Sequence, residues 1–564
     1  MSIFKLHLKT ILLILFVTIF FSTLNAKNID KFYNGNNISN YFSGILLLND
    51  NFYDESHKYL KKLNGLEESH LEYTSKYLFS LVNSGKFREA YNYSKKIESK
   101  KLDSFESDLI IGIYNLKEKK YDLANKYFLK LKKRNSGFIL SEFITESLLT
   151  WSSVKNLSLS ESQKRIDNMD SRFENLKNIQ NVFLHCHYNS SKTEFYFKKL
   201  TTNLKTDFSR YNYFYSNYLI NQGEIEKAEE FLKFSINLYP RNLLLNQQKI
   251  NLINNKIKNN FNCKDQSHVV AEIFYITANA LSSQSYYTLS NFYINVSKFL
   301  NEEFFSYNTL LAENYYKIEY FDKAKKIYND MKRHGEVYSW YAAKQNARIL
   351  IKENKKEKAL KQLSKAYEKF SLKNIYETYD YADFLKNNEK FEESIKYYTK
   401  IIKDLKTDHP LFPQATEGRG IAYERVGDWE KAEKDLLKSL KVKPDQAYVI
   451  NYLAYSWIEK GINIEKSLKM LEEANRLRKD DPYIIDSLGW ALYKLKKYKE
   501  AKKYLQIAVE LMPADPIVND HFGDVLWKNG HKIQARYYWN YVLKLKKTKE
   551  DQRKKIENKL VLGL

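Results

Sequence analysis

The fold is decided by residues 482–515, which read PYIIDSLGWALYKLKKYKEAKKYLQIAVELMPAD. In this stretch Gly489 precedes Ala501 by 12 residues, and Ala501 precedes Pro513 by 12 residues. The flanking stretches repeat this spacing, at Gly420, Ala432 and Pro444 and again at Gly523 and Ala535. A fixed period of about 34 residues predicts a tandem array of one supersecondary unit.

Each unit is expected to be two antiparallel helices joined by a short turn. A small residue such as Gly489 or Ala501 is needed where two helices cross closely, because a bulky side chain there would push the helices apart. Proline ends the second helix, since it lacks an N–H group and clashes with the preceding turn. The large apolar residues between these positions then fill the space between the helices.

The same register extends through most of the chain. The clearest units are 413–446, 447–481, 482–515 and 516–549, and weaker ones are 375–408, 340–374, 305–339, 271–304, 209–242, 105–138, 71–104 and 37–70. All prolines fall at or near the ends of units: Pro240, Pro410, Pro413, Pro444, Pro482, Pro513 and Pro516. Residues 139–208 and 243–270 fit the register poorly.

This pattern resembles the tetratricopeptide repeat, a helix–turn–helix unit of 34 residues. Unit 482–515 supplies the residue types preferred by the family, at Leu488, Gly489, Leu492, Ala501, Leu505, Ala508 and Pro513. Unit 413–446 departs from the family at one position, where Arg419 replaces a large apolar residue. The resemblance implies an all-α fold, a right-handed α-solenoid of antiparallel helix–turn–helix units in two superhelical blocks.

The expected organisation has five parts. Residues 1–26 are a signal peptide, 27–242 an N-terminal block in which 139–208 is degenerate, and 243–270 a joint or degenerate unit. Residues 271–549 form the C-terminal superhelix. Residues 550–564 keep apolar residues at helical spacing and are expected to form a helix that caps the exposed end.

The N-terminus reads as a secretory signal. Lys5 and Lys9 precede an apolar run from Ile11 to Phe21, and Ala26 offers a small residue for cleavage. The mature chain is then expected to begin near Lys27 and to be periplasmic. An uncleaved anchor with peripheral membrane association stays open as the alternative.

The net charge of +24 raises the alternative of a nucleic-acid-associated helical-repeat protein. The basic residues do not form a block of five or more, and Lys, Asn, Ile, Tyr and Phe are over-used together, as in AT-rich genomes. We therefore interpret the charge as compositional and expect no nucleic-acid partner. A cytoplasmic scaffold is the further alternative if the signal is not used.

No catalytic, cofactor or metal site is predicted. His185, Cys186 and His187 are adjacent in sequence, so on a helix they point in different directions and cannot share one ion. Cys186 and Cys263 are expected to stay unbridged, because segments two repeats apart in a solenoid do not touch. An enzyme with its active site in residues 139–270 remains a rival, opposed by the absence of paired catalytic residues.

The resemblance places ligands in the concave groove, on the first helix of each unit. Carried over to this chain, the groove candidates are Tyr448, Asn451, Tyr455, Tyr483, Asp486, Trp490, Tyr493, Lys494, Asp520, Asp524 and Trp527. Aromatic side chains there suit binding hot spots. They suit equally a structural role, half-buried against the neighbouring first helix.

The family members that clamp a carboxylate use Lys, Asn and Arg in this groove. The corresponding positions here include Glu417, Asp486 and Trp490, so an acidic C-terminus is not the expected ligand. We expect an extended or helical segment of another protein instead. The sequence thus predicts a non-catalytic protein–protein interaction scaffold or adaptor in the bacterial cell envelope.

The register can be tested by replacing its smallest residue. Gly489→Phe is expected to drive two helices apart and to lower the free energy of unfolding by about 1–3 kcal/mol or more through overpacking. Thermal unfolding of the variant measures this loss. An unchanged melting temperature would show that the register is wrong.

Overall fold

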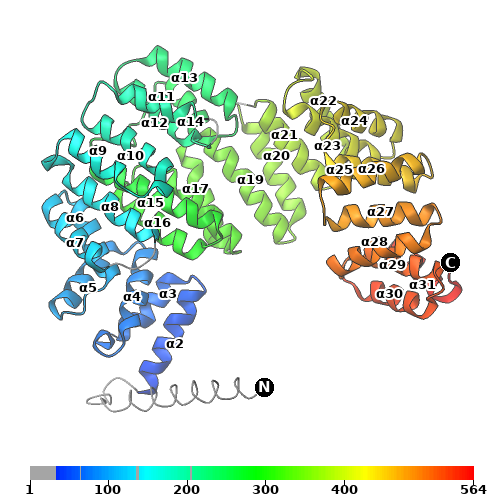
Figure 1. The fold of residues 1–564 in the computed structure, drawn as a ribbon, viewed down its shortest axis with the longest axis horizontal. Coiled ribbons are helices and arrows are strands. Elements are labelled where there is room, and N and C mark those ends of the chain that lie inside the picture. Colours follow the sequence, from blue (N-terminus) through cyan, green and yellow to red (C-terminus); the bar gives the residue numbers. More distant parts are fainter. Residues whose placement is uncertain (1–33, 64, 135–138, 204–205, 372) are drawn as a thin grey trace. The chain divides into compact units, whose positions relative to one another are not determined.

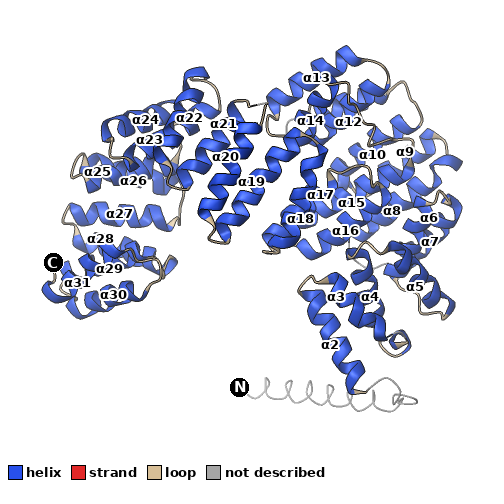
Figure 2. Cartoon of the chain, turned by 180° about the vertical axis from the view of Figure 1, so that it is seen from behind, coloured by secondary structure: helices blue, strands red, loops and turns tan. Residues whose placement is uncertain are grey.

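The structure is a computed structural model that describes residues 34–63, 65–134, 139–203, 206–371 and 373–564. The elements of these residues are α-helices and short 3-10 helices, without a strand (Figures 1 and 2). The signal sequence expected at 1–26 lies outside the described residues. The chain divides into two compact units, unit 1 (Met1–Ala366) and unit 2 (Tyr367–Leu564).

Unit 1 is a succession of helices that pack mainly as neighbouring pairs. Its first half contains α2 (Gly35–Asn49), α3 (Tyr53–Leu60), α4 (Leu71–Asn83), α5 (Phe87–Ser99), α6 (Phe105–Lys117), α7 (Tyr121–Arg134), α8 (Ile139–Ser153), α9 (Leu159–Asp167) and α10 (Glu174–His187). Its second half contains α11 (Thr193–Thr201), α12 (Ser209–Asn221), α13 (Ile225–Leu238), α14 (Leu243–Ile253), α15 (Gln266–Ser283), α16 (Tyr287–Leu300), α17 (Tyr307–Lys317), α18 (Phe321–Met331) and α19 (Glu336–Lys352). Helix α20 (Lys356–Lys369) runs across the division between the units.

After α20, the described residues of unit 2 form five regular hairpins and a last single helix. The first helices of the hairpins are α21 (Ile375–Asn387), α23 (Leu411–Arg425), α25 (Ala447–Glu459), α27 (Pro482–Lys494) and α29 (Pro516–Lys528). The second helices are α22 (Phe391–Asp404), α24 (Trp429–Val442), α26 (Ile464–Leu477), α28 (Tyr498–Leu511) and α30 (Lys532–Lys544). The C-terminal tail forms α31 (Glu550–Leu562).

The small residues of the register lie where the two helices of a hairpin cross. A Cβ atom added to Gly489 would lie 2.6 Å from the Leu505 side chain, which is too close for any real contact. At the equivalent Gly523, the added Cβ would lie 2.5 Å from Trp539. The predicted all-helical fold of crossed hairpins is confirmed.

Gly427 follows the end of the first helix α23 at φ +86°, a left-handed conformation that favours glycine.

The departure at Arg419 has a local explanation. Its guanidinium donates to both carboxylate oxygens of Asp435 on the second helix of the same hairpin, at 2.6 and 2.9 Å. Asp435 is buried, so the bidentate pair replaces an apolar contact with a charge-assisted one.

The inner face of the first half of unit 1 is filled by the chain itself. The hairpin α15–α16 packs against the first helices α4, α6 and α8. Phe292 and Phe299 of α16 stack on Phe79 and Phe87, with ring centroids 5.3 and 4.2 Å apart. At the same contact the buried Asn295 amide donates to Asn83 Oδ1 at 3.2 Å.

The expected joint at 243–270 lies inside unit 1. It forms α14, an irregular connection and the start of α15, while the compact units divide between Ala366 and Tyr367. The division therefore differs from the predicted blocks 27–242 and 271–549. The poorly fitting stretch 139–208 is also helical over most of its length, with α8 to α11.

The two cysteines are bridged, so the expectation that they stay apart is wrong. Cys186 in α10 forms a disulfide with Cys263, and their Cα atoms lie 5.9 Å apart. The expectation assumed a regular solenoid. Here the connection after α14 returns across α10 and α12, where Phe261 packs against Phe183 and Phe214 with centroids 5.0 and 4.5 Å apart.

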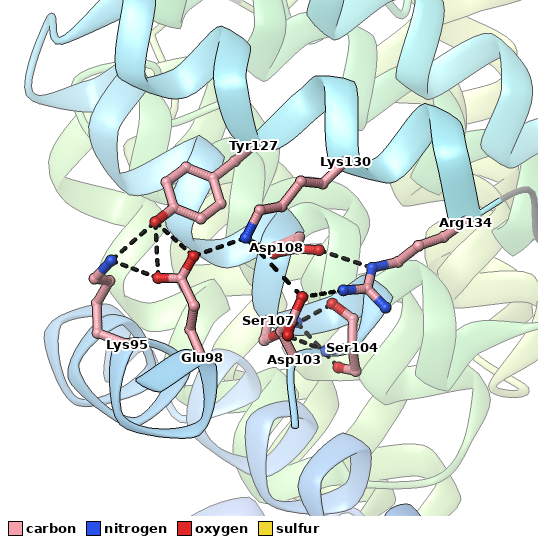
Figure 3. Close-up of polar contacts among 9 residues, drawn as sticks. All are labelled: Lys95, Glu98, Asp103, Ser104, Ser107, Asp108, Tyr127, Lys130 and Arg134. Carbon is pink, nitrogen blue, oxygen red and sulfur yellow. Dashed lines mark hydrogen bonds and ion pairs between the residues drawn. The ribbon is translucent and has the colours of Figure 1, made fainter. Parts of the chain in front are cut away.

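A cluster of charged side chains joins consecutive hairpins at α5 and α7 (Figure 3). Glu98 of α5 accepts hydrogen bonds from Lys130 Nζ at 2.7 Å and from the Tyr127 hydroxyl at 2.8 Å, both from α7. Lys95, one turn earlier on α5, donates to the same carboxylate at 2.5 Å. Burial would raise the pKa of Glu98, but these donors outweigh burial and lower it to about 2.

The cluster continues toward the start of α6. Arg134 of α7 donates to Asp103 and, at 2.8 Å, to the fully buried Asp108 (Figure 3). Ser104 and Ser107 cap the N-terminus of α6 reciprocally. Burial raises the pKa of Asp108 despite Arg134 and Lys130. These contacts hold neighbouring hairpins together and leave the charged groups of the cluster occupied with one another.

In the part of the chain that the structure describes, no helix is both long and apolar enough to cross a membrane.

The Glu98 cluster predicts a pH dependence of stability. Because the pKa of Glu98 is lowered on folding, its contribution is present above its ordinary value of 4.5 and is lost as the pH falls through about 2. Glu98→Gln is expected to lose about 1–3 kcal/mol at pH 7 and much less near pH 2. Hydrogen exchange of α5 to α7 measures the effect locally, with the exposed Glu118→Gln as the control. An equal loss at both pH values would contradict the assignment.

Candidate partner-binding groove

The candidate groove residues lie on three consecutive first helices, α25, α27 and α29, which contact one another in sequence. Two of these helices begin in the same way. Asp481 and Asp515 accept hydrogen bonds from the first backbone N–H groups, and a proline follows each as the first helical residue. These caps fix where each helix starts and hence which side chains face the neighbouring helix.

Tyr448 and Tyr483, near the start of their helices, are accessible. Their exposed fractions are 48% and 56%, the largest among the aromatic candidates. The Tyr448 hydroxyl donates to Asp481 Oδ2 at 2.9 Å, and the Arg478 guanidinium lies 4.6 Å from its ring. The side chain is therefore oriented by residues at the end of its own unit, while about half of it stays exposed.

Trp490, in contrast, is only 8% exposed and lies within a stack of rings. The Tyr493 ring stacks nearly parallel on the Trp490 ring, with their centroids 4.6 Å apart. The His521 ring also stacks on Trp490, with a centroid distance of 3.9 Å and an angle of 12° between the ring planes. Its indole N–H donates to Glu459 at 2.7 Å, and Lys494, which is exposed, lies 5.0 Å from its ring. Trp490 therefore binds the first helices to one another.

Asp486 forms a buried ion pair with His521 of the following repeat. Asp486 Oδ2 lies 3.0 Å from His521 Nδ1. Burial would lower the pKa of His521, but the carboxylate of Asp486, helped by Asp520 and Asp524, raises it. In the sequence, Asp486 is the fifth residue of unit 482–515 and His521 is the sixth residue of unit 516–549.

Asp520 and Asp524 are occupied by the chain's own C-terminal helix. Lys559 Nζ lies 2.6 Å from Asp520 and 2.7 Å from Asp524, and the Trp539 indole N–H donates to Asp524 at 3.0 Å. Burial and the neighbouring Asp520 carboxylate raise the pKa of Asp524 to about 6, against the lowering effect of Lys559. Lys559 was not among the predicted groove residues.

The remaining candidates are partly buried. Tyr455 lies beside Asp486 and Glu459, and burial, with these carboxylates, raises its pKa. Asn451 Oδ1 is buried without a hydrogen-bond partner among the described residues. Trp527 lies 5.4 Å from Trp539, with Arg536 4.8 Å from its ring. Of the candidates, Tyr448, Tyr483 and Lys494 are exposed, and the others are buried or partly buried.

The cysteine–histidine triplet faces three different partners. His185 hydrogen bonds to Ser190 at 2.9 Å, His187 to the Cys263 carbonyl oxygen at 3.1 Å, and Cys186 is in the disulfide. Among the residues that the structure describes, no three His, Cys, Asp or Glu side chains are grouped to hold a metal ion.

The contact of Lys559 with the two aspartates can be tested by removing its charge. Lys559→Met leaves a buried carboxylate uncompensated and is expected to cost about 3 kcal/mol, read as faster hydrogen exchange in α31 and a lower melting temperature. Lys555→Met, an exposed position on the same helix, is the control and should change stability by less than about 0.5 kcal/mol. Equal behaviour of the two variants would show that Lys559 is not held by the groove.

The family model described as tetratricopeptide repeat matches residues 341–548. The TPR repeat-containing protein PA4667 of Pseudomonas aeruginosa is 28% identical over 176 residues, which is 31% of this chain, and the match spans only 29% of that relative.

Among solved structures, a tetratricopeptide repeat protein from Parabacteroides merdae covers 45% of this chain and 97% of its own, at 14% identity and a TM-score of 0.38. A MamA structure from Desulfovibrio magneticus covers 32% of this chain and 99% of its own, at 19% identity and a TM-score of 0.27. The family match contains all three helices of the candidate groove. On the residues and the family match together, residues 341–548 of the chain consist of tetratricopeptide repeats.

Proposed function

We propose that this chain is a non-catalytic scaffold of the bacterial cell envelope, and that it binds segments of other proteins on the first helices of residues 447–549. Tetratricopeptide repeat proteins generally mediate protein–protein interactions. The observation that carries the proposal is the exposure of Tyr448 and Tyr483, near the starts of the consecutive first helices α25 and α27, together with exposed Lys494 at the end of α27.

The filled inner face of unit 1 supports placing the binding surface in unit 2. Helices α4, α6 and α8 already contact the hairpin α15–α16, and Asn83 and Phe79 are engaged there. A partner segment would have to displace a covalently attached competitor, which has a high effective concentration. Among the first helices α25, α27 and α29, the C-terminal helix α31 forms hydrogen bonds or ion pairs with α29, at Pro516, Asp520 and Asp524.

Two features support an exported location. The first 26 residues have the order of a signal peptide, with Lys5 and Lys9 before an apolar run. The disulfide between Cys186 and Cys263 is of the kind that persists in oxidising compartments such as the periplasm. Cleavage near Lys27 would release the mature chain, and retention of the segment would anchor it.

A photo-crosslinking amino acid tests both parts of the proposal in cells. Placed at Tyr483, it is expected to give adducts with specific envelope proteins, because that ring is exposed on a first helix. Tyr537, 69% exposed on the second helix α30, is the matched control and is expected to give none of the same adducts. Fractionation of the same cells should place the protein in the periplasm with an N-terminus near Lys27.

Identical adducts from both positions would contradict a groove-specific site. A cytoplasmic protein that keeps Met1 would contradict the envelope location and make the basic surface the leading guide to its partners.

A further inference from the structure

The first helix of unit 1, α2, is apolar on two opposite faces. On the face that packs on α3, Gly44 and Leu48 are buried. On the opposite face, Ile38, Phe42 and Leu46 follow one another at intervals of four residues and therefore form one stripe along the helix. Their exposed fractions are 44%, 60% and 62%, so all three side chains can be reached from outside.

This stripe lies on a helix without charge. None of the 15 residues of α2 is Asp, Glu, Lys or Arg, whereas 28% of the residues of the chain are. Helix α5, which also borders solvent in unit 1, carries Arg88, Glu89 and Lys95 among its charged residues. A helix that faces water normally presents polar and charged side chains outward. The outward face of α2 is therefore suited to surroundings less polar than water.

Basic side chains are exposed beside α2. Leu60 of α3 packs at Gly44, so the end of α3 and the 3-10 helix η1 (Lys61–Leu63) lie along α2. Three exposed lysines occur there: Lys58, Lys61 and Lys62. Of these, Lys61 lies 3.6 Å from Glu89 of α5. The acidic residues of the hairpin lie around its turn, at Asp50, Asp54 and Glu55. The part of the hairpin away from the turn is therefore basic and can be attracted to anionic lipid headgroups.

The size of the stripe and its place in the chain favour lipid over a protein partner. Three apolar side chains that are about half exposed can bury on the order of 300 Å², well under the roughly 800 Å² that each partner of a stable protein interface buries. A bilayer surface sets no such minimum, because its binding adds inserted apolar area to charge attraction. The apolar run Ile11–Phe21 also precedes α2 in the sequence, and the export that it predicts would bring this end of the chain to a membrane.

We propose that the exposed stripe of α2 is a lipid-contacting surface, which holds the N-terminal end of unit 1 on a bilayer that contains anionic lipid. Ile38, Phe42 and Leu46 enter the boundary between headgroups and acyl chains. The lysines of α3 and η1 keep their ammonium groups at the level of the headgroups. This contact uses no residue of the candidate groove in unit 2 and does not depend on the proposed binding of partner segments there.

The test is flotation with vesicles of phosphatidylethanolamine and phosphatidylglycerol, using the purified chain that begins at Lys27 and so retains every described residue. Because a chain with a net charge of +24 binds anionic vesicles nonspecifically at low salt, flotation is carried out at about 0.5 M salt, which screens charges more than about 5 Å apart. The unaltered chain is expected to float with the vesicles. The double variant Phe42→Gln and Leu46→Gln is expected to lower the partition coefficient about 10-fold or more, since two apolar side chains no longer enter the lipid.

The matched control is the double variant Ile533→Gln and Tyr537→Gln. These two residues are also four positions apart and are 87% and 69% exposed, on the second helix α30 of unit 2. The control should float like the unaltered chain, and circular dichroism establishes that both variants are folded.

The proposal would be overturned by an unaltered chain that does not float, or by two double variants that float alike. Sedimentation without vesicles tests the remaining occupant. A concentration-dependent dimer that the Phe42 and Leu46 variant abolishes would assign the stripe to a second copy of the chain and would also overturn the proposal. Crosslinking at Tyr483 is independent of these outcomes, so the partner groove is tested separately.

Discussion

The close approach of two helices within each hairpin is the constraint on which the rest of the structure depends. Gly489 and Gly523 stand where a single added carbon would overlap Leu505 or Trp539 of the partner helix. Because the small residue lies on the first helix and the large one on the second, the hairpin has one sequence-defined crossing point. Stacking of such hairpins then determines which side chains of the first helices face the next repeat, and so defines the groove.

The two units use the same hairpin in different ways. In unit 1 the first helices pack on a later hairpin of the same chain, with stacked rings such as Phe79 on Phe292 and a buried amide contact at Asn295. In unit 2 the first helices bind one another through Trp490, His521 and Asp486 and leave tyrosines at their starts exposed. Tetratricopeptide repeats generally bind segments of other proteins, and in unit 1 the first helices contact a later hairpin of their own chain.

The regular part of the fold could be predicted because its determinants are local. Gly489, Ala501 and Pro513 lie within one unit, and their spacing alone indicates the crossing and the end of the second helix. The disulfide could not be predicted, because it depends on a connection that returns across α10 after an irregular segment. The sequence placed the candidate groove residues on first helices, as the structure has them, but it could not predict their contacts. Whether an aspartate is free or paired depends on His521 of the next repeat and on Lys559 of the C-terminal helix.

The return of the chain in unit 1 sets an order of folding events. Lys323 Nζ hydrogen bonds to the carbonyl oxygen of Asn51, 272 residues earlier, whereas the hairpins of unit 2 join residues within one repeat of one another. Local contacts form quickly, and contacts across long stretches of chain form slowly. Unit 2 can assemble hairpin by hairpin. The apolar first helices of the early hairpins remain uncovered until α16 to α18 have been synthesised. During that interval they are the part of the nascent chain most in need of a chaperone.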